Sequence, residues 1–441
     1  MGFNKIFILG IGGVGYCLLE IFNLEKLYKG YEFTLIEPRK IEGLDSVMKG
    51  RKWKLINEAM TRENYKRILS GLDNKSILIN VSINVDSIML IKLCSEVGAH
   101  YIDTSLEQYI DYIQVPVEEI NDYSQFKRNN LFHQNIEAIK ANSSSRKTKC
   151  ISSGMNPGLI STLTKQSLVE YARVMGKKLV KGNYAKLAHD LGLEEIRIVE
   201  TDTQELKIKP SKRLFVNTWS CIGLQEEAGD LVMMSLNKAD EDKLIEQGYK
   251  LITPDEYKDT RIRFVAGMRG MDMMTKSVNI DEKGRVFEYV GRCIPHAEII
   301  TLSQFLQYKG DSPTIFYSYK VSDETDKSLE YFKANNYHNL PEWQVVRNKD
   351  IDGGYDIIGS LLRFKNGDKF GGWTVLGDED VKKLGIQSGA TPLQVVAFIN
   401  AVVKWIKANP YKGINNSETI PKKYIWKHAK KYLGKLIFKK I

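Results

Sequence analysis

Short apolar runs alternate with segments of helical periodicity in the first third of the chain. Residues 5–9 form an apolar run of strand length, and residues 16–24 place Cys17, Leu18 and Ile21 on one helical face. Further strands are predicted at 32–36, 76–81, 100–103 and 150–153, and further helices at 86–97 and 118–141. Strands that alternate with helices predict an α/β fold whose N-terminal domain is a Rossmann-type, doubly wound parallel sheet.

The pattern changes after residue 157, where short β-prone runs follow one another with helical patches between them. These runs lie at 196–200, 214–219, 261–266 and 286–290. They predict a second α+β domain built on a mainly antiparallel sheet. Near the C-terminus, Thr391 and Gln394 have capping-box spacing and Pro392 suits the first helical turn, so a helix is predicted from Thr391 to about Asn409.

A glycine-rich turn joins the first predicted strand to the first predicted helix. Residues 10–15 read Gly-Ile-Gly-Gly-Val-Gly, a GxGxxG pattern whose glycines permit a tight turn, close approach of a pyrophosphate, and close packing of helix on strand. Glu37 ends the next strand, where a carboxylate accepts hydrogen bonds from ribose hydroxyls and repels a 2′-phosphate. This favours NAD over NADP, although Arg39 and Lys40 weaken the preference.

The cofactor site is therefore expected to contain Gly10, Gly12, Gly13, Val14, Gly15 and Glu37. Ser82, Thr104 and Asn156 follow other strands, at the sheet edge where a nicotinamide or a substrate binds in such folds, although a turn role is the alternative for each. The predicted organisation is a dinucleotide-binding domain at 1–155, a substrate, catalytic and dimerisation domain at 156–385, a helical segment at 386–420 that returns toward the first domain, and a basic amphipathic tail at 421–441.

Composition narrows the classes of protein that fit. The 441 residues are 43% hydrophobic and 27% charged, and no apolar stretch reaches the roughly 20 residues of a spanning helix, so a soluble, cytoplasmic protein without a transmembrane segment is expected. The five cysteines are odd in number and the six histidines are scattered, so no disulfide framework and no metal are predicted. The net charge of +10 lies mostly in the lysines of 421–441, which argues against a specific nucleic-acid partner and predicts a basic amphipathic helix there.

Acidic and aromatic side chains that suit a cationic substrate gather in a few segments. Glu107 follows a strand, Glu200 lies in Glu-Thr-Asp-Thr-Gln, Trp219 precedes Glu227 by eight residues, and His296 has a carboxylate two residues on. Each has a plainer interpretation: a solvated acid, a core tryptophan or a packing histidine.

Several strings occur together and in a fixed order. They are Gly154-Met155-Asn156-Pro157-Gly158, Glu200-Thr201-Asp202-Thr203-Gln204, Phe215-Val216-Asn217-Thr218-Trp219-Ser220, the segment around His296, and Ser388-Gly389-Ala390-Thr391-Pro392-Leu393-Gln394-Val395 with Asn409-Pro410. In this combination the chain resembles bacterial-type homospermidine synthases, of the saccharopine dehydrogenase-like group. The resemblance implies NAD-dependent, redox-neutral aminobutyl transfer that joins two putrescines, or spermidine and putrescine, through an imine with release of ammonia or 1,3-diaminopropane. It also implies a homodimer.

The same resemblance implies roles for individual residues. Trp219 would hold a cationic intermediate by a cation–π contact, Glu200 would pair with a substrate ammonium, and Glu227 would meet the distal amine. Asn156 would line the nicotinamide, and Glu107 and His296 would complete the polar ring. The chain departs from the pattern at Cys221-Ile222 and at Pro295, which leaves the pocket shape and the diamine preference open.

Two alternatives stand beside this hypothesis. A saccharopine- or carboxynorspermidine-dehydrogenase-like oxidoreductase would use the same fold, but its carboxylated substrates call for arginine clamps. A non-catalytic NAD-binding protein, or one that uses its basic tail at a membrane surface, is the alternative from a different class.

Overall fold

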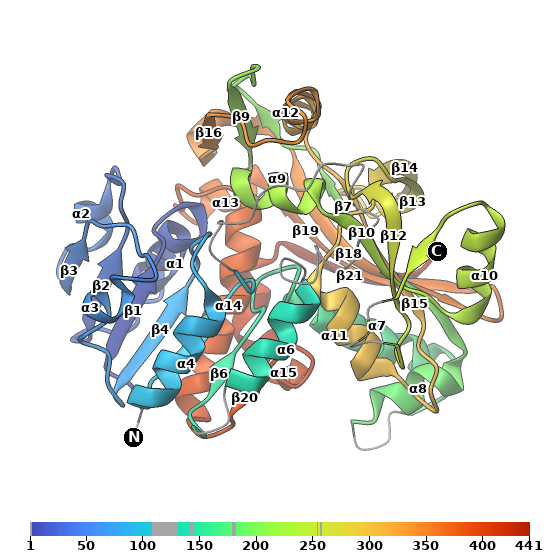
Figure 1. Ribbon diagram of the computed structural model, residues 1–441, viewed down its shortest axis with the longest axis horizontal. Coiled ribbons are helices and arrows are strands. Elements are labelled where there is room, and N and C mark those ends of the chain that lie inside the picture. Colours follow the sequence, from blue (N-terminus) through green and yellow to red (C-terminus); the bar gives the residue numbers. More distant parts are fainter. Residues whose placement is uncertain (1, 108–130, 142–144, 179–181, 254, 256–257) are drawn as a thin grey trace. The chain divides into compact units, whose positions relative to one another are not determined.

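A computed structural model describes residues 2–107, 131–141, 145–178, 182–253, 255 and 258–441 (Figure 1). Contacts divide the chain into two compact units, each of which is considered by itself. Among described residues, unit 1 comprises those of Met1–Ile113, Leu131–Leu159 and Val381–Tyr432, and unit 2 comprises those of Ile160–Asp380 and Leu433–Ile441. Unit 1 thus joins the N-terminal third to a segment close to the C-terminus.

Unit 1 is built on a parallel sheet. Its strands are β1 (Lys5–Leu9), β2 (Glu32–Ile36), β3 (Lys52–Ile56), β4 (Ser76–Asn80), β5 (His100–Asp103), β6 (Lys149–Cys150) and β20 (Ile414–Asn415). Their order is β20-β6-β5-β4-β1-β2-β3, and each neighbouring pair is parallel. The predicted doubly wound parallel sheet is confirmed.

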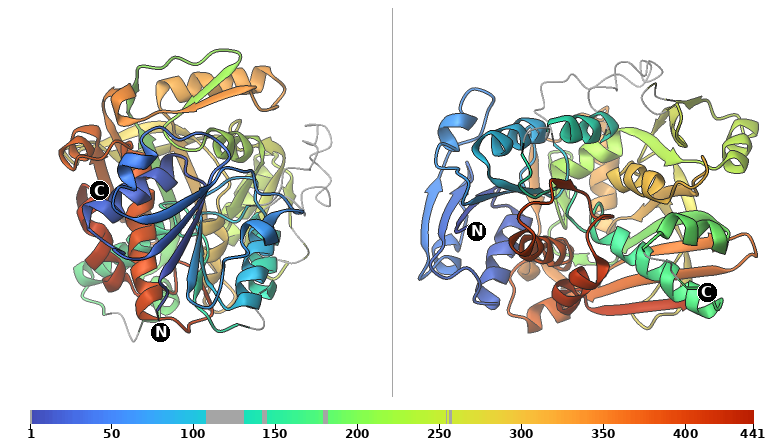
Figure 2. Two further views of the ribbon diagram at one scale, coloured as in Figure 1. Left: turned by 90° about the vertical axis from the view of Figure 1, so that its left-hand side faces the viewer. Right: turned by 90° about the horizontal axis from the view of Figure 1, so that it is seen from below.

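Helices lie on both faces of this sheet, as the left view of Figure 2 shows. They are α1 (Gly13–Leu24), α2 (Leu44–Val47), α3 (Tyr65–Ile68), α4 (Ser87–Val97), α6 (Leu131–Ala141), α14 (Ala390–Ala408), α15 (Lys422–Ala429) and the 3-10 turn η4 (Lys430–Tyr432); α13 (Asp378–Lys383) spans the boundary between the units. The Asp86 carboxylate caps α4 by accepting a hydrogen bond from the Met89 N–H, and Gly98 ends the helix in the left-handed conformation. The part of the predicted helix before residue 131 lies outside the described residues, and 131–141 is helical as expected.

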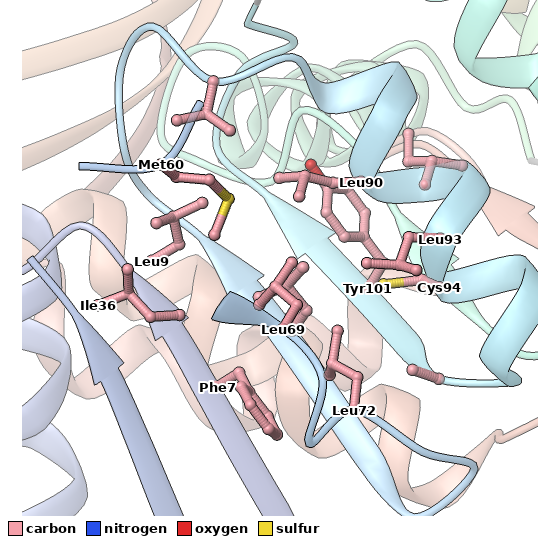
Figure 3. Close-up of a cluster of buried hydrophobic side chains, with 14 of the residues drawn as sticks. Phe7, Leu9, Ile36, Met60, Leu69, Leu72, Leu90, Leu93, Cys94 and Tyr101 are labelled. Carbon is pink, nitrogen blue, oxygen red and sulfur yellow. The ribbon is translucent and has the colours of Figure 1, made fainter. Parts of the chain in front are cut away.

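The core of unit 1 forms where α4 packs on the strands. Figure 3 shows Phe7, Leu9 and Ile36 of the central strands beside Leu90 and Leu93 of α4. Each of these side chains is at most 9% exposed. Their burial holds the glycine-rich turn after β1 at a fixed place on the sheet.

Two local predictions in unit 1 are wrong. The capping box at Thr391 does not form, because α14 begins one residue earlier and Gly389 occupies the N-cap position without a side-chain hydrogen bond. The helix does end at Asn409, as expected. The strand predicted at 150–153 ends at Cys150, and two residues later the Ser152 N–H donates to the side-chain carboxylate of Asp103 rather than to a backbone carbonyl.

Unit 2 is built on a ten-stranded sheet. Its strands are β7 (Leu193–Asp202), β10 (Leu231–Ser235), β11 (Leu251–Ile252), β12 (Ile262–Arg269), β13 (Met274–Ile280), β14 (Val286–Arg292), β15 (Thr314–Lys320), β18 (Tyr355–Phe364), β19 (Lys369–Gly377) and β21 (Lys435–Lys440). The main path runs β11-β12-β10-β15-β7-β18-β19-β21, and the β13–β14 hairpin joins it at β15. Only β15 and β7 are parallel among the described pairs of this sheet, so the predicted mainly antiparallel sheet is confirmed.

Smaller elements complete unit 2. They are α7 (Leu159–Val174), whose first residue is assigned to unit 1, α8 (Tyr184–Leu191), α9 (Cys221–Gly229), α10 (Lys238–Glu246), α11 (Ala297–Leu306), α12 (Asp323–Ala334) and η3 (Asn348–Asp350), with β8 (Glu205–Leu206) paired to β17 (Ile351–Gly353) and β9 (Leu214–Asn217) paired to β16 (Glu342–Val345). None of the helices in the described part of the chain combines the length and apolar character needed to cross a bilayer.

The predicted basic amphipathic helix forms over Lys422–Ala429 only, so the prediction is wrong for the rest of the tail. Helix α15 and η4 end before Gly434, which adopts a φ of +62°, and β21 then adds to the edge of β19. The lysines of β21 have structural partners: Lys440 pairs with Asp368 at 2.6 Å, and Lys435 donates to the Glu282 carbonyl at 3.1 Å. Lysines along an edge strand also discourage pairing with other chains.

Gly434→Ala is expected to lower the midpoint of urea unfolding more than Gly385→Ala does. Both glycines have positive φ, which costs an alanine about 1 kcal/mol. A Cβ at Gly434 would also lie 2.1 Å from the Val375 carbonyl oxygen, whereas nothing lies within 4 Å at Gly385. Equal shifts of the two midpoints would contradict the observed path of the tail.

Candidate functional site

The glycine-rich turn of unit 1 has the geometry that its sequence predicts. Gly10 has a φ of +89°, and a Cβ on it would lie 2.8 Å from the Ser82 backbone. A Cβ on Gly15 would lie 2.0 Å from the Gly10 carbonyl oxygen, so this contact allows only glycine. At Gly12, by contrast, the nearest atom to an added Cβ is the flexible end of Arg39 at 3.7 Å. Only glycine therefore fits at positions 10 and 15, whereas the space beside Gly12, between them, is open.

Helix α1 begins directly after this open position. Gly12 is its N-cap, and Gly13 and Val14 are its first residues. No side chain among the described residues caps the helix. Its first N–H groups and the positive end of its dipole thus suit an anion, which is the fit that a dinucleotide pyrophosphate requires.

Glu37 lies at the end of β2, beside this turn, and is 2% exposed. Its carboxylate accepts hydrogen bonds from the Ile11 N–H at 2.9 Å and from Arg39 Nε at 2.7 Å. Burial alone would raise the pKa of Glu37, but the hydrogen bonds from Arg39 and Ile11 outweigh it and hold the pKa below its usual value. Glu37 is therefore ionised at neutral pH, as recognition of ribose hydroxyls needs.

The other predicted residues of unit 1 follow the strands next to β1. Ser82 donates to Asn80 Oδ1 at 2.6 Å after β4, and Thr104 directly follows β5. Asn156 precedes a cis proline in the turn after β6. Glu107 accepts from Ser105 Oγ at 2.6 Å, and its N–H donates to Ser87 at the start of α4. Since β6, β5, β4 and β1 are neighbours in the sheet, the segments that carry these residues leave the same edge.

A second set of polar side chains gathers on one face of the sheet in unit 2. On β7, Glu200 and Asp202 are two residues apart and so project from the same face. Glu200 pairs in register with Tyr319 of β15, and Asp202 pairs with Asp356 of β18. These three carboxylates are at most 3% exposed. We refer to Glu200, Asp202, Asp356, Tyr317 and Tyr319 as the acidic face.

Tyrosines of β15 contact the predicted residues on this face. The Tyr317 hydroxyl donates a hydrogen bond to Glu200. Tyr319 accepts a hydrogen bond from Trp219 Nε1 at 3.2 Å. The sequence analysis did not single out either tyrosine. Their spacing of two residues in a β-prone segment places them on one face of a strand, but the sequence does not reveal that this strand pairs with β7.

His296 is held between two carboxylates. Its Nε2 lies 3.1 Å from Glu227 of α9, and its Nδ1 lies 3.2 Å from Glu298 of α11. Burial lowers the pKa of His296, but the charges and hydrogen bonds of both glutamates outweigh it, so the pKa lies well above its ordinary value. Glu298, which the sequence analysis noted only as a neighbouring carboxylate, thus shares this cluster.

Trp219 is positioned by the turn between β9 and α9. Thr218 donates to Asp202 Oδ2 at 2.8 Å, and Ser220 caps α9 by accepting from the Gly223 N–H at 3.0 Å. The indole lies over Gly223, where a Cβ would approach it to 3.2 Å. Burial raises the pKa of Asp202 although Gln204 and Thr218 donate to it. The half-buried Trp219 is therefore fixed by the chain on both of its sides.

Cys221, at which the chain departs from the family pattern, lies in the protein interior. Cys221 is 1% exposed, and its thiol contacts the Phe215 carbonyl at 3.7 Å.

A titratable group that the sequence analysis did not single out, Asp230, lies near Glu227. Burial raises the pKa of Asp230 to about 7, against the opposing effects of the Leu231 N–H and Arg269.

Comparison with known proteins shows what the chain is similar to. Residues 6–145 match the family model for the saccharopine dehydrogenase NADP binding domain. Curated homospermidine synthases of Blastochloris viridis and Mesorhizobium japonicum are each 24% identical to the chain, covering 98% of it and 90% and 89% of their own lengths. These matches confirm the predicted resemblance and the dinucleotide-binding class of unit 1.

Solved structures agree. A homospermidine synthase from Legionella pneumophila, crystallised in complex with NAD, has a TM-score of 0.82 and 26% identity, covering 99% of this chain and 91% of that one. Saccharopine dehydrogenase from Saccharomyces cerevisiae has a TM-score of 0.54 and 12% identity, which shows a shared fold alone. The predicted fold class is confirmed; the roles of individual site residues stay predictions.

Glu37→Ala is expected to weaken NAD binding about tenfold and to improve NADP binding relative to NAD, because it removes a charged hydrogen-bond acceptor and frees Arg39 for a phosphate. Titration calorimetry with both dinucleotides measures the ratio. Glu42→Ala, which removes an exposed acid from the same segment, is the control. An unchanged ratio in Glu37→Ala would refute the role of this carboxylate.

His296→Gln is expected to lower thermal stability most below neutral pH. A histidine whose folded pKa is raised contributes stability that is fully present below its unfolded pKa of about 6.5 and is lost as pH rises through the folded pKa. The difference in unfolding midpoint between wild type and variant should therefore shrink from pH 6 to pH 9. A difference that grows with pH would show that His296 is neutral in the native state.

Proposed function

We propose, from the similarity of nearly the whole chain to homospermidine synthases, that it joins two putrescines into homospermidine and releases ammonia. Spermidine would serve as an alternative donor, with release of 1,3-diaminopropane. The observation that carries the proposal is the acidic face of unit 2 with Trp219 and the His296 cluster beside it. Buried carboxylates and an aromatic face suit a ligand with two ammonium groups and no carboxylate.

Residues of unit 1 would hold the cofactor. The turn at Gly10–Gly15 and the N-terminus of α1 would bind the pyrophosphate, Glu37 the adenosine ribose, and Ser82, Thr104 and Asn156 the nicotinamide half. NAD, when bound, accepts a hydride from an amine-bearing carbon and later returns one to an imine, so the overall reaction has no net redox change. Glu107 would complete the polar surroundings of the substrate.

The reacting amine must lose its proton before its carbon can give up a hydride. His296 holds its proton because two glutamates face it. When the distal ammonium of the substrate pairs with Glu227, part of the negative charge around His296 is compensated. The pKa of His296 then falls toward neutrality, and His296 releases its proton to water. In our proposal the neutral Nε2 of His296 then takes the proton of the reacting ammonium, which Glu200 holds in place.

An iminium ion forms after the hydride leaves, and water would hydrolyse it. Trp219, half-buried and fixed by its neighbours, would cover this ion with its ring face and stabilise the positive charge. Ammonia then leaves as the second diamine adds to the same carbon. His296 would give the proton it took to the departing ammonia, take a proton from the second diamine before that amine adds, and give it to the secondary amine of the product.

The resemblance also supports two finer proposals. We infer that the protein works in the cytoplasm, where its five free and buried cysteines stay reduced. We infer further that it forms a homodimer, which light scattering of the purified chain would test. A saccharopine-type net oxidoreductase is the second candidate, because the family model that matches unit 1 carries that name.

Incubation of the full-length protein with NAD and putrescine carrying deuterium at both end carbons tests the activity. We expect homospermidine by mass spectrometry with all eight deuteriums retained and no accumulation of NADH, because the hydride that is removed is returned. Loss of one deuterium when unlabelled NADH is added to the same incubation would show exchange with free cofactor. Accumulating NADH, or no coupled product, would overturn the proposal and favour the oxidoreductase.

A further inference from the structure

Tyr317 and Tyr319 form a stacked pair on β15. Their ring centroids are 5.5 Å apart with an interplanar angle of 14°, and each side chain is 1% exposed. Two tyrosines buried to this extent need partners for their hydroxyl groups. The partners they have are residues that the proposed reaction uses.

The pair connects three functional groups that come from different elements. Tyr317 donates to Glu200 of β7, and its ring and that of His296 pack edge to face with centroids 4.7 Å apart. Tyr319 accepts from Trp219 Nε1 at 3.2 Å. Stacking of the two rings therefore fixes the distance between the Tyr317 hydroxyl, which contacts Glu200, and the Tyr319 hydroxyl, which contacts Trp219.

We propose that Tyr317 and Tyr319 are positioning residues for aminobutyl transfer: Tyr319 orients the indole of Trp219, and Tyr317 orients the carboxylate of Glu200. This inference rests on the proposed function, which it deepens by dividing the labour between the two hydroxyls. Neither tyrosine needs to touch the substrate for this role.

The two hydroxyls act at different stages of the reaction. A cation–π contact depends on which way the ring face points, and the single N–H of an indole leaves one hydrogen bond to set that direction. The cation that Trp219 stabilises exists only after the hydride has left, so Tyr319 acts on the chemical step. Glu200 binds the substrate ammonium from the start, so Tyr317 acts on binding. Burial raises the pKa of Tyr317, which keeps its hydroxyl protonated and able to donate.

Steady-state kinetics of Tyr319→Phe and Tyr317→Phe separate these roles. Both variants keep the ring and the stack and remove only a hydroxyl. Tyr319→Phe is expected to lower kcat about tenfold while KM for putrescine stays within about twofold, and Tyr317→Phe is expected to raise KM about tenfold with a smaller effect on kcat.

Tyr289→Phe is the matched control. Tyr289 is 6% exposed, lies on the neighbouring strand β14, and donates to the Ser318 carbonyl at 2.7 Å. Its hydroxyl contacts none of the residues of the proposed mechanism among the described hydrogen bonds, so kcat and KM should stay at wild-type values. A loss in this variant as large as in the other two would show that any buried hydroxyl of this sheet matters only for folding.

Nuclear magnetic resonance gives a readout that does not depend on turnover. Among the indole N–H signals of the six tryptophans, that of Trp219 is assigned by its absence in Trp219→Phe. Tyr319→Phe should shift this signal upfield, since the hydrogen bond to the hydroxyl is lost, and Tyr289→Phe should leave it in place.

The outcomes separate this inference from the proposed function. An unmoved Trp219 signal, or a Tyr319→Phe variant with wild-type kcat in an active enzyme, overturns the positioning role and leaves the function intact. A wild type that makes no homospermidine overturns the function, while the shift of the signal still decides whether Tyr319 orients Trp219.

Discussion

Buried carboxylates on one face of the sheet in unit 2 are the constraint on which the rest of the site depends. Two adjacent strands carry Glu200, Asp202 and Asp356, each at most 3% exposed. Glu298, two residues after His296, is fully buried as well. Charges removed from water need donors or a cation. Hydroxyl donors and an imidazolium supply part of that need, and a ligand with ammonium groups supplies more.

The two units thus present opposite electrostatic surroundings to their ligands. Unit 1 offers backbone N–H groups at the start of α1, which suit the negative charge of a pyrophosphate. Unit 2 offers carboxylates and an indole, which suit a cation. A redox-neutral transfer between amines needs both an anion site and a cation site, since the cofactor is anionic and the intermediates that bear the aminobutyl group are cationic.

Sequence reasoning was accurate where the signal is local. The strand, glycine turn and helix at residues 5–24 and the acid Glu37 are consecutive in the chain, and each lies where predicted. It failed where pairing between distant strands decides the structure. Tyr317 contacts Glu200 only because β15 pairs with β7, and β21 replaces the last part of a predicted helix because it pairs with the edge of β19. Helical spacing in a lysine-rich tail could not reveal that edge.

Titration calorimetry of the full-length protein with putrescine tests the central claim most directly. The account predicts that putrescine binds, that butane-1,4-diol, which has the same length and no charge, does not, and that Glu200→Gln weakens putrescine binding about tenfold or more. Equal binding of the diol, or an unchanged affinity in Glu200→Gln, would contradict the claim that the acidic face recognises a dication.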